Sequence, residues 1–289
     1  TTTTTSTTIT SPSSSTTTIT STTITSPSLV YTTIISNPLG YTAFTLNNTL
    51  YIYYTTGNRL NGIKITGTSV ANTTVPDIIA TAPSYYQDGL LLITYINNSL
   101  TIAHWSLNGT LHILTIPIDY YYAYAFNPST SLTGALWWPR LPAYSESRLI
   151  IFKGSLIIAN VSMPNANMLV LCPNGTFIIQ LLNTTFVTYP GYRDYNGYQA
   201  FGCNYYMTGG VLYYDGLHVS LPNAFYAYPN GSLVIGYLPS GVELASLNGT
   251  VLYSLDIGMP SKALVFKIDG YYYLVASTSS DRLVVYRMG

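Results

Sequence analysis

Charged residues are scarce in this sequence, and their scarcity excludes several kinds of protein. Only 7% of the 289 residues are charged, with ten Lys and Arg balancing ten Asp and Glu, whereas about a quarter of an ordinary soluble domain is charged. The basic residues are scattered singly, so the chain offers no basic patch for nucleic acid. With so few carboxylates to protonate, we expect its stability to depend weakly on pH.

Long hydrophobic runs are also missing. Hydrophobic residues make up 47% of the chain and the mean hydropathy is +0.26, yet the longest apolar runs, such as 90–93 and 149–152, are only strand-sized. A membrane-spanning helix needs about 20 apolar residues in a row, so we expect no membrane span. The chain starts in a threonine run without a basic or apolar leader, and we expect that any signal peptide has been removed.

Cysteine occurs only twice, at Cys172 and Cys203. One disulfide formed in an oxidising compartment would account for both, although the count alone also permits two buried free thiols. His104, His112 and His218 lie far apart along the chain, and no Cys–His cluster is present. We therefore expect no metal site.

The usual signatures of enzymes are absent as well. No G-x-S-x-G, P-loop or G-x-G-x-x-G motif occurs. A glycosidase would need a pair of carboxylates, and the candidates are Glu146, Glu243 and eight aspartates, of which Asp215 and Asp269 fall in predicted turns. We expect no enzyme and no cofactor, and keep a glycoside-active enzyme as a distant alternative.

The chain consists instead of short strand-like segments separated by turns, without helical periodicity. Asp215-Gly216 and Asp269-Gly270 each separate two β-prone segments, and this dipeptide suits the type I′ turn of a hairpin. We interpret seven turn signals as the first turns of successive meanders. Their mean spacing is about 37 residues, the length of one propeller blade. They lie near Asn47, Asn97, Lys153, Asn174, Asp215, Asn248 and Asp269.

This spacing predicts an all-β domain over residues 29–289, a β-propeller of six or seven blades. Residues 29–36 could supply a strand that closes the ring beside residues 283–287. Two β-sandwich domains are the alternative, because the same short strands would permit them.

Residues 1–28 form a Thr/Ser-rich tract with too little apolar surface to fold by itself. Its repeat combines threonines with one isoleucine, and such β-branched residues favour extended backbone. The tract is either an O-glycosylated stalk or an extended arm that pairs with its own domain or with a neighbouring subunit. The repeated residues are Thr7, Thr8, Ile9, Thr17, Thr18, Ile19, Thr22, Thr23 and Ile24.

Sequons for N-glycosylation are the most informative motif. Nine occur, where about four would arise by chance. They fall mainly at predicted turn tips, where glycans would hydrate a surface with little charge, so we expect most of them to be modified. Asn-Gly turns followed by threonine also create sequons without glycans. The nine begin at Asn47, Asn72, Asn97, Asn108, Asn160, Asn174, Asn183, Asn230 and Asn248.

Tyrosine is unusually abundant, with 29 residues. Clusters of tyrosine could form aromatic platforms for sugar rings or for a protein partner, or they could simply pack between sheets. The clusters include 120–124, 192–195, 205–206 and 225–228.

The low charge, the abundant Tyr, Ile, Thr and Asn, the dense sequons and the Thr/Ser tract together resemble secreted surface glycoproteins of thermoacidophilic archaea, including subunits of their extracellular filaments. In thread-like filaments of that kind, an N-terminal strand of one subunit completes the sheet of the next, which would make residues 1–36 an assembly arm. The apolar N-terminal helix of type IV pilins is missing.

The resemblance implies an extracellular structural or adhesive protein that carries N-glycans. Its partners would be copies of itself or other surface proteins. The alternative is a monomeric carbohydrate- or receptor-binding propeller on a cell or virion surface, with the tract as a stalk.

Overall fold

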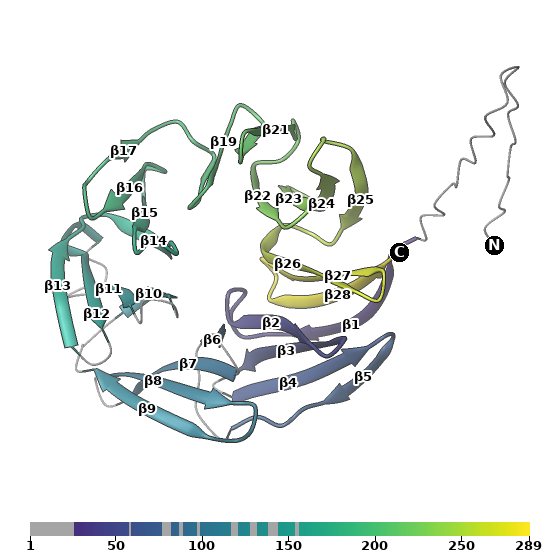
Figure 1. The fold of residues 1–289 in the computed structure, drawn as a ribbon, viewed down its shortest axis with the longest axis horizontal. Coiled ribbons are helices and arrows are strands. Elements are labelled where there is room, and N and C mark those ends of the chain that lie inside the picture. Colours follow the sequence, from purple (N-terminus) through teal and green to yellow (C-terminus); the bar gives the residue numbers. More distant parts are fainter. Residues whose placement is uncertain are drawn as a thin grey trace, which may run out of the picture.

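The computed structural model describes residues 26–57, 59–76, 82–86, 89–96, 99–116, 121–127, 132–137, 144–153 and 156–289. These residues form seven four-stranded antiparallel sheets arranged as the blades of a ring (Figure 1). The predicted propeller is therefore confirmed, with seven blades. Within the same residues, the helical structure is one 3-10 turn, Tyr144–Glu146, and no helix is long and apolar enough to cross a membrane.

Blades 1 to 6 each follow the chain from an inner strand, next to the central opening, to an outer strand (Figure 1). Blade 1 contains β2 (Tyr41–Leu46), β3 (Thr49–Thr56), β4 (Arg59–Thr66) and β5 (Ser69–Asn72). Blade 2 contains β6 (Ala82–Tyr86), β7 (Gly89–Ile96), β8 (Ser99–Ser106) and β9 (Leu111–Ile116). Blade 3 contains β10 (Tyr121–Asn127), β11 (Leu132–Trp137), β12 (Arg148–Lys153) and β13 (Leu156–Ser162).

The next three blades repeat this order. Blade 4 contains β14 (Ala166–Leu171), β15 (Phe177–Leu181), β16 (Phe186–Tyr189) and β17 (Asp194–Tyr195). Blade 5 contains β18 (Ala200–Phe201), β19 (Tyr205–Thr208), β20 (Val211–Tyr214) and β21 (Leu217–Ser220). Blade 6 contains β22 (Tyr226–Asn230), β23 (Leu233–Leu238), β24 (Gly241–Ser246) and β25 (Val251–Asp256).

Blade 7 joins the two ends of the domain. It contains β26 (Pro260–Ile268), β27 (Tyr271–Thr278) and β28 (Arg282–Met288), and its outer strand is β1 (Ser28–Ile34). β1 runs antiparallel to β28, with Ser28 opposite Arg287 and Ile34 opposite Arg282. The predicted closing strand is thus confirmed, and backbone hydrogen bonds between the start and the end of the domain close the ring.

Six of the seven turn signals lie in six different blades, and the seventh, Asn97, lies outside the described residues. Not all six are first turns, so that part of the prediction is wrong. Asn47, Asn174 and Asp269 do lie between the first and second strands of their blades. Asp215 and Asn248 instead lie between the third and fourth strands, and Lys153 ends the third strand of blade 3. The mean spacing still matched the blade repeat, because the six described signals each fall in a different blade.

Both Asp-Gly hairpins have the predicted backbone. Asp215 and Gly216 have φ angles of 50° and 77°, and Asp269 and Gly270 have angles of 49° and 83°. Two successive residues with positive φ are the requirement of a type I′ turn, whose twist matches that of the flanking strands. The two aspartates are therefore turn residues.

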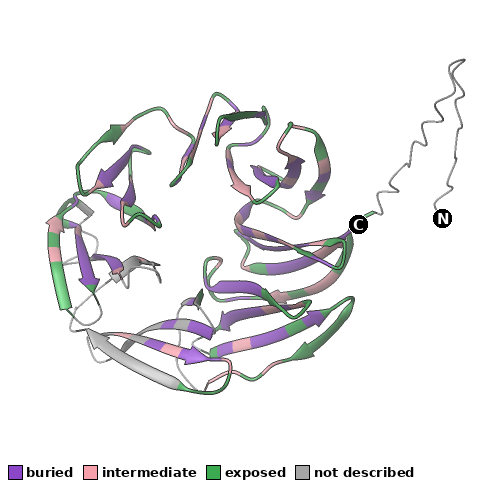
Figure 2. Cartoon of the chain, in the orientation of Figure 1, coloured by how far each residue is buried: buried purple, intermediate pink, exposed green. Residues whose placement is uncertain are grey.

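The hydrophobic core lies between neighbouring blades, and burial decreases from the inner to the outer strands (Figure 2). Inner and middle strands are covered by a blade on each side, so β23 is buried along almost its whole length, whereas all four residues of the outer strand β5 are exposed. This explains why many strands read as continuous apolar runs, as strands covered on both faces do.

The junctions differ greatly in size. Thirteen buried residues, among them Tyr41, Ile52 and Val285, form the cluster between blades 7 and 1, and another thirteen lie between blades 6 and 7. The junction of blades 4 and 5 buries only Cys172, Ile178 and Phe186. Among the junctions that the structure describes, those on either side of the closing blade therefore have the largest buried clusters.

Removal of β1 tests the closure. We expect the chain without residues 1–34 to lose at least about 3 kcal/mol of unfolding free energy, because about half a dozen backbone hydrogen bonds to β28 are lost and each contributes about 0.5–1.5 kcal/mol. The melting temperature, measured by circular dichroism, should fall by at least about 6 °C. The control is the chain without residues 1–25, which keeps β1. Equal melting temperatures for the two truncated chains would contradict the closure.

Candidate functional site

Four sequons occupy the same kind of hairpin turn. In each turn, the residue two before the asparagine donates its N–H to the carbonyl of the residue two after it, as Cys172 does to Thr176 at 2.8 Å. The residue that follows the asparagine has a positive φ, 84° at Gly175 and 65° at Thr184. This is the three-residue hairpin loop with a bulge, in which glycine is favoured. The four turns are centred on Asn108, Asn174, Asn183 and Asn248.

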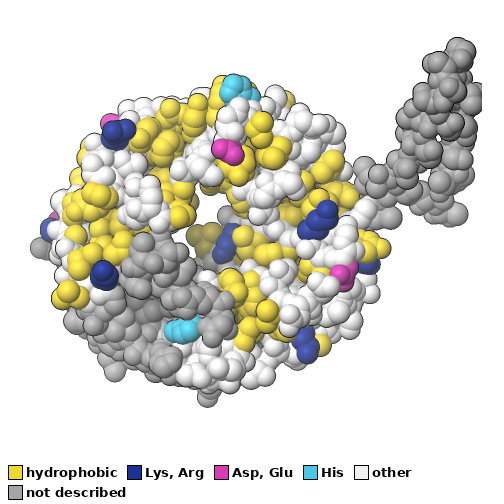
Figure 3. Space-filling model, viewed as in Figure 1, with side chains coloured by type: hydrophobic (Ala, Val, Ile, Leu, Met, Phe, Trp, Pro, Cys, Tyr) yellow, Lys and Arg dark blue, Asp and Glu magenta, His cyan; other side chains and the backbone are white. Residues whose placement is uncertain are grey.

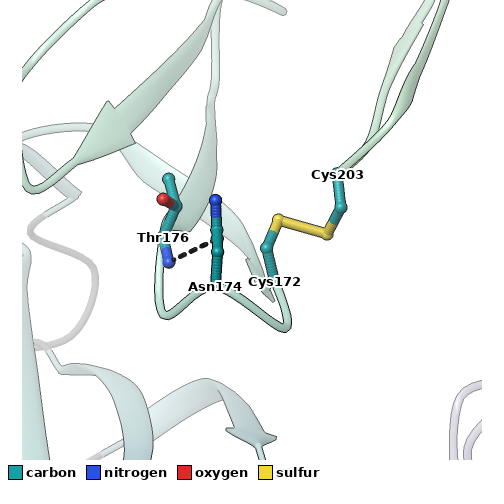
Figure 4. Close-up of a disulfide and its surroundings, with 4 residues drawn as sticks. All are labelled: Cys172, Asn174, Thr176 and Cys203. Atoms are coloured by element: carbon teal, nitrogen blue, oxygen red, sulfur yellow. Dashed lines mark hydrogen bonds between the residues drawn. A yellow bond between two sulfur atoms is a disulfide. The ribbon is translucent and has the colours of Figure 1, made fainter.

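The asparagine side chains themselves complete these turns. Asn174 Oδ1 accepts a hydrogen bond from the backbone N–H of Thr176 at 3.0 Å (Figure 4), and the same bond occurs at Asn108, Asn183 and Asn248 at 3.1–3.2 Å. Such local bonds are typical of asparagine in turns. They use the oxygen and leave the amide nitrogen Nδ2, the atom that carries an N-glycan, unbonded within the described residues. All four side chains are exposed and available for modification.

The other sequons are held differently. Asn47 and Asn72 are exposed, at the tip of the β2–β3 turn and at the end of β5. Asn160 is exposed on the outer strand β13, where its Oδ1 accepts a hydrogen bond from Arg148 Nε at 2.6 Å. Asn97 lies outside the described residues. Asn230 alone among the eight described sequons donates its Nδ2 within the fold, to the carbonyl of Val265 in blade 7 at 2.7 Å.

The order of strands places these turns on the two faces of the ring. Turns between strands one and two and between strands three and four of a blade lie on one face, which we call the inner-hairpin face, and the remaining connections lie on the opposite face. Asn72 and Asn183 lie on the opposite face, and Asn160 lies on the outer edge. The sequons on the inner-hairpin face are Asn47, Asn108, Asn174, Asn230 and Asn248.

The two cysteines form the predicted disulfide. Cys172 and Cys203 lie in the first turns of blades 4 and 5, with their Cα atoms 5.4 Å apart (Figure 4). The bond crosses the junction whose buried cluster is the smallest of those that the described residues form. It therefore reinforces the ring where packing contributes least.

The residues of the predicted assembly arm, from Thr7 to Ile24, lie outside the described residues. The described chain starts at Ser26, immediately before β1 on the circumference of the ring. The choice between a stalk and a donated strand therefore remains a prediction.

Tyrosines link the inner parts of blades 5, 6 and 7. The hydroxyl groups of Tyr205 and Tyr226 lie 3.2 Å apart. Tyr237 Oη accepts a hydrogen bond from the N–H of Ala263 at 2.7 Å, and Tyr228 Oη donates to the carbonyl of Ala263. Burial raises the pKa of Tyr237 to about 12. These tyrosines stay neutral and serve as hydrogen-bonding packing residues.

Lys262, on the inner strand β26, is a residue that the sequence did not single out. Its Nζ donates a hydrogen bond to the carbonyl of Tyr41 in blade 1 and lies 4.6 Å from the centre of the Tyr41 ring. Tyr41 in turn donates to the carbonyls of Lys262 and Val275 at 3.0 and 3.1 Å. Burial lowers the pKa of Lys262 to about 8. No sequence motif marks this lysine, because its contact with Tyr41 depends on how blade 7 packs against blade 1.

Candidate metal ligands do not gather in the described part of the chain, where no group of three or more His, Cys, Asp and Glu residues lies together. His104 and His112, which are far apart in sequence, are nevertheless register partners on β8 and β9. Glu146 lies exposed in the 3-10 turn and Glu243 lies in β24.

No protein-family model matches the chain, and no curated protein matches it either. Solved structures share its fold. A crystal structure of the mitotic checkpoint complex matches with a TM-score of 0.56 at 9% identity, over 99% of this chain and 98% of that one. The β-propeller domain of the Trilobed protease from Pyrococcus furiosus gives 0.53 at 9% identity, over 86% and 92%. The AfRom2 CNH domain gives 0.50 at 8% identity, over 91% and 99%. At such low identity these similarities show the propeller fold alone.

Loss of the disulfide should weaken the fold measurably. We expect the double variant Cys172→Ser, Cys203→Ser to unfold with about 3–4 kcal/mol less free energy in urea, because the bond closes a loop across 31 residues of sequence. Reducing agent should bring the wild type to the stability of the variant and leave the variant unchanged. A variant as stable as the oxidised wild type would contradict the reinforcing role.

Occupancy of the sequons should follow the bonding of Nδ2. We expect peptide mass mapping of the protein from its natural source to find glycans on Asn108, Asn174, Asn183 and Asn248, and little or none on Asn230, whose nitrogen is bonded to Val265. Asn174→Gln should remove the mass of one glycan, whereas Asn230→Gln should remove none. Glycosylation of Asn230 as complete as that of Asn174 would contradict the argument.

Proposed function

We propose that this protein is an extracellular glycoprotein with a structural or adhesive role, and that it is a subunit of a cell-surface filament assembled through its N-terminal arm. The observation that carries the proposal is the shared geometry of the four sequon turns, which keeps the folded turn intact while Nδ2 stays exposed. An extracellular location is also supported by the disulfide.

The surface supports the same proposal. Charged side chains are sparse on the visible face, with hydrophobic side chains between them (Figure 3). Ile34 and Leu156 are 70% and 67% exposed. Few charges and many apolar side chains favour aggregation, and glycans would supply the hydration that the side chains lack.

The outer strand β13 illustrates this role for a glycan. Its residues Leu156, Ile157 and Ile158 are all exposed, and it is the last strand of its sheet. An exposed apolar edge invites pairing with other chains. A glycan on Asn160, in the same strand, would block that pairing and keep this edge in solution.

Assembly by strand donation is supported by where the arm enters the domain. β1 is the outermost strand of blade 7, so residues before it leave the domain at its circumference, where another subunit can be reached. An extended segment that adds to a sheet edge gains main-chain hydrogen bonds, and its alternate side chains provide specificity. The apolar side chains of Ile9, Ile19 and Ile24 would provide that specificity. We propose a role without catalysis, with copies of the same chain or other surface proteins as partners.

Truncation of the arm tests the assembly. We expect the full chain to form filaments, seen by negative-stain electron microscopy, and the chain without residues 1–25 to remain a folded monomer. Replacing Ile9, Ile19 and Ile24 by lysine should abolish filaments, whereas replacing them by valine should preserve them. Filaments that persist without residues 1–25 would refute strand donation by the arm. A monomeric full chain would refute the filament altogether.

A further inference from the structure

Blade 5 carries a groove that the structural role leaves unexplained. It has a volume of about 190 Å³ and opens between the first and third turns of the blade. We call it the blade 5 groove. The residues used below are Asn204, Tyr206, Tyr213, Asp215 and His218, which all line it.

The floor of the groove is a ladder of rings. Tyr206, Tyr213 and His218 are successive register partners on β19, β20 and β21, so their side chains share one face of the sheet. The rings of Tyr206 and Tyr213 are stacked, with centres 4.7 Å apart and planes 10° apart. The ring of His218 meets Tyr213 edge-on, also at 4.7 Å.

The ladder is covered only in part, and its exposure increases toward His218. At its inner end the ring of Tyr198 meets that of Tyr206 edge-on, with ring centres 5.0 Å apart. Tyr198 also packs, with Phe201, against the small buried cluster at the junction of blades 4 and 5. The outer strand of blade 4, β17, has only two residues. At the outer end of the ladder, His218 is exposed and Tyr213 is half-buried.

Polar groups surround these rings without internal partners. The side chains of Asn204, Asp215 and His218 make no hydrogen bond to any residue that the structure describes, and Asn204 and Asp215 are exposed. They offer amide, carboxylate and imidazole groups beside an aromatic surface. No Lys or Arg lines the groove.

We propose that the blade 5 groove binds a neutral hexose ring of a glycan carried by another molecule. The hydroxyls of a pyranose match the unbonded polar groups, and its apolar C–H groups match the accessible parts of the Tyr206, Tyr213 and His218 rings. A pocket below the usual ~300 Å³ of a ligand site suits one sugar ring rather than a larger ligand. The carboxylate of Asp215, without a basic neighbour in the groove, disfavours acidic sugars. This binding activity goes beyond the structural role proposed above.

The test is titration calorimetry on the full secreted chain with neutral oligosaccharides of glucose, mannose and galactose, and with oligogalacturonate as the acidic member. We expect at least one neutral oligosaccharide to bind and the acidic one not to. Tyr213→Ala should weaken binding at least tenfold, and Tyr213→Phe, which keeps the stacked ring, should change it less than threefold. Asp215→Asn keeps a residue that tolerates positive φ and should reduce the discrimination against oligogalacturonate.

The control is Tyr192→Ala, an exposed tyrosine of blade 4 outside the groove, which should leave binding unchanged.

If Tyr213→Ala melts well below the wild type, His218→Ala tests the same floor at an exposed position. The proposal is overturned if no neutral sugar binds, or if these floor variants bind like the wild type. Binding that appears only in Asn174→Gln also overturns it, because the chain's own glycan would then fill the groove. The groove lies within one blade, so these outcomes do not depend on filament assembly.

Discussion

The pairing of β1 with β28 is the contact on which the rest of the ring depends. Every blade packs between two neighbours, so a ring that opens at one junction exposes both faces there. The two largest clusters among the described residues flank blade 7, with thirteen buried residues each, and Tyr41 adds hydrogen bonds from blade 1 to two carbonyls of blade 7.

The junction of blades 4 and 5 combines three features: short strands, a disulfide and a partly accessible aromatic surface. β17 and β18 have two residues each, so they bury little between the blades. The disulfide compensates for the small cluster on the inner-hairpin face. The half-buried rings of Tyr206 and Tyr213 lie in the blade 5 groove beside this junction. Weak packing, a covalent cross-link and a partly accessible aromatic surface therefore occur at the same junction.

With few charges, the chain relies on tyrosine for polar interactions inside the ring. A tyrosine fills space between blades like an apolar residue and still satisfies a backbone group, as Tyr237 does at Ala263. Burial then favours the neutral phenol, and the pKa values of Tyr41 and Tyr228 rise. This solution works in the core but supplies little solubility outside, which is why the surface is where glycans would matter.

Local chemistry was readable from the sequence, and long-range packing was not. The Asp-Gly hairpins follow from a few neighbouring residues, and the structure confirms them. The turn signals gave the blade spacing but not which turn of a blade each one formed. The closing strand joins the two ends of the domain, so its confirmed position followed from the predicted ring rather than from its own neighbours. The partnership of His104 with His112 and the contact of Lys262 with Tyr41 depend on register and on blades far apart in the chain. No local pattern encodes either of them.

The tyrosine clusters show where prediction from local sequence stops. In sequence, Tyr205-Tyr206 and Tyr226-Ala227-Tyr228 look alike, and each could be a platform or a packing element. In the structure, Tyr205 bonds Tyr226 between blades 5 and 6, while Tyr206, on the other face of the same strand, lines the groove. Alternation along β19 separates the two roles, but what each tyrosine contacts is set by different blades: Tyr226 of blade 6 for Tyr205, and Tyr198, packed against blade 4, for Tyr206. The environment of one tyrosine therefore depends on blades that its own sequence neighbours do not reveal.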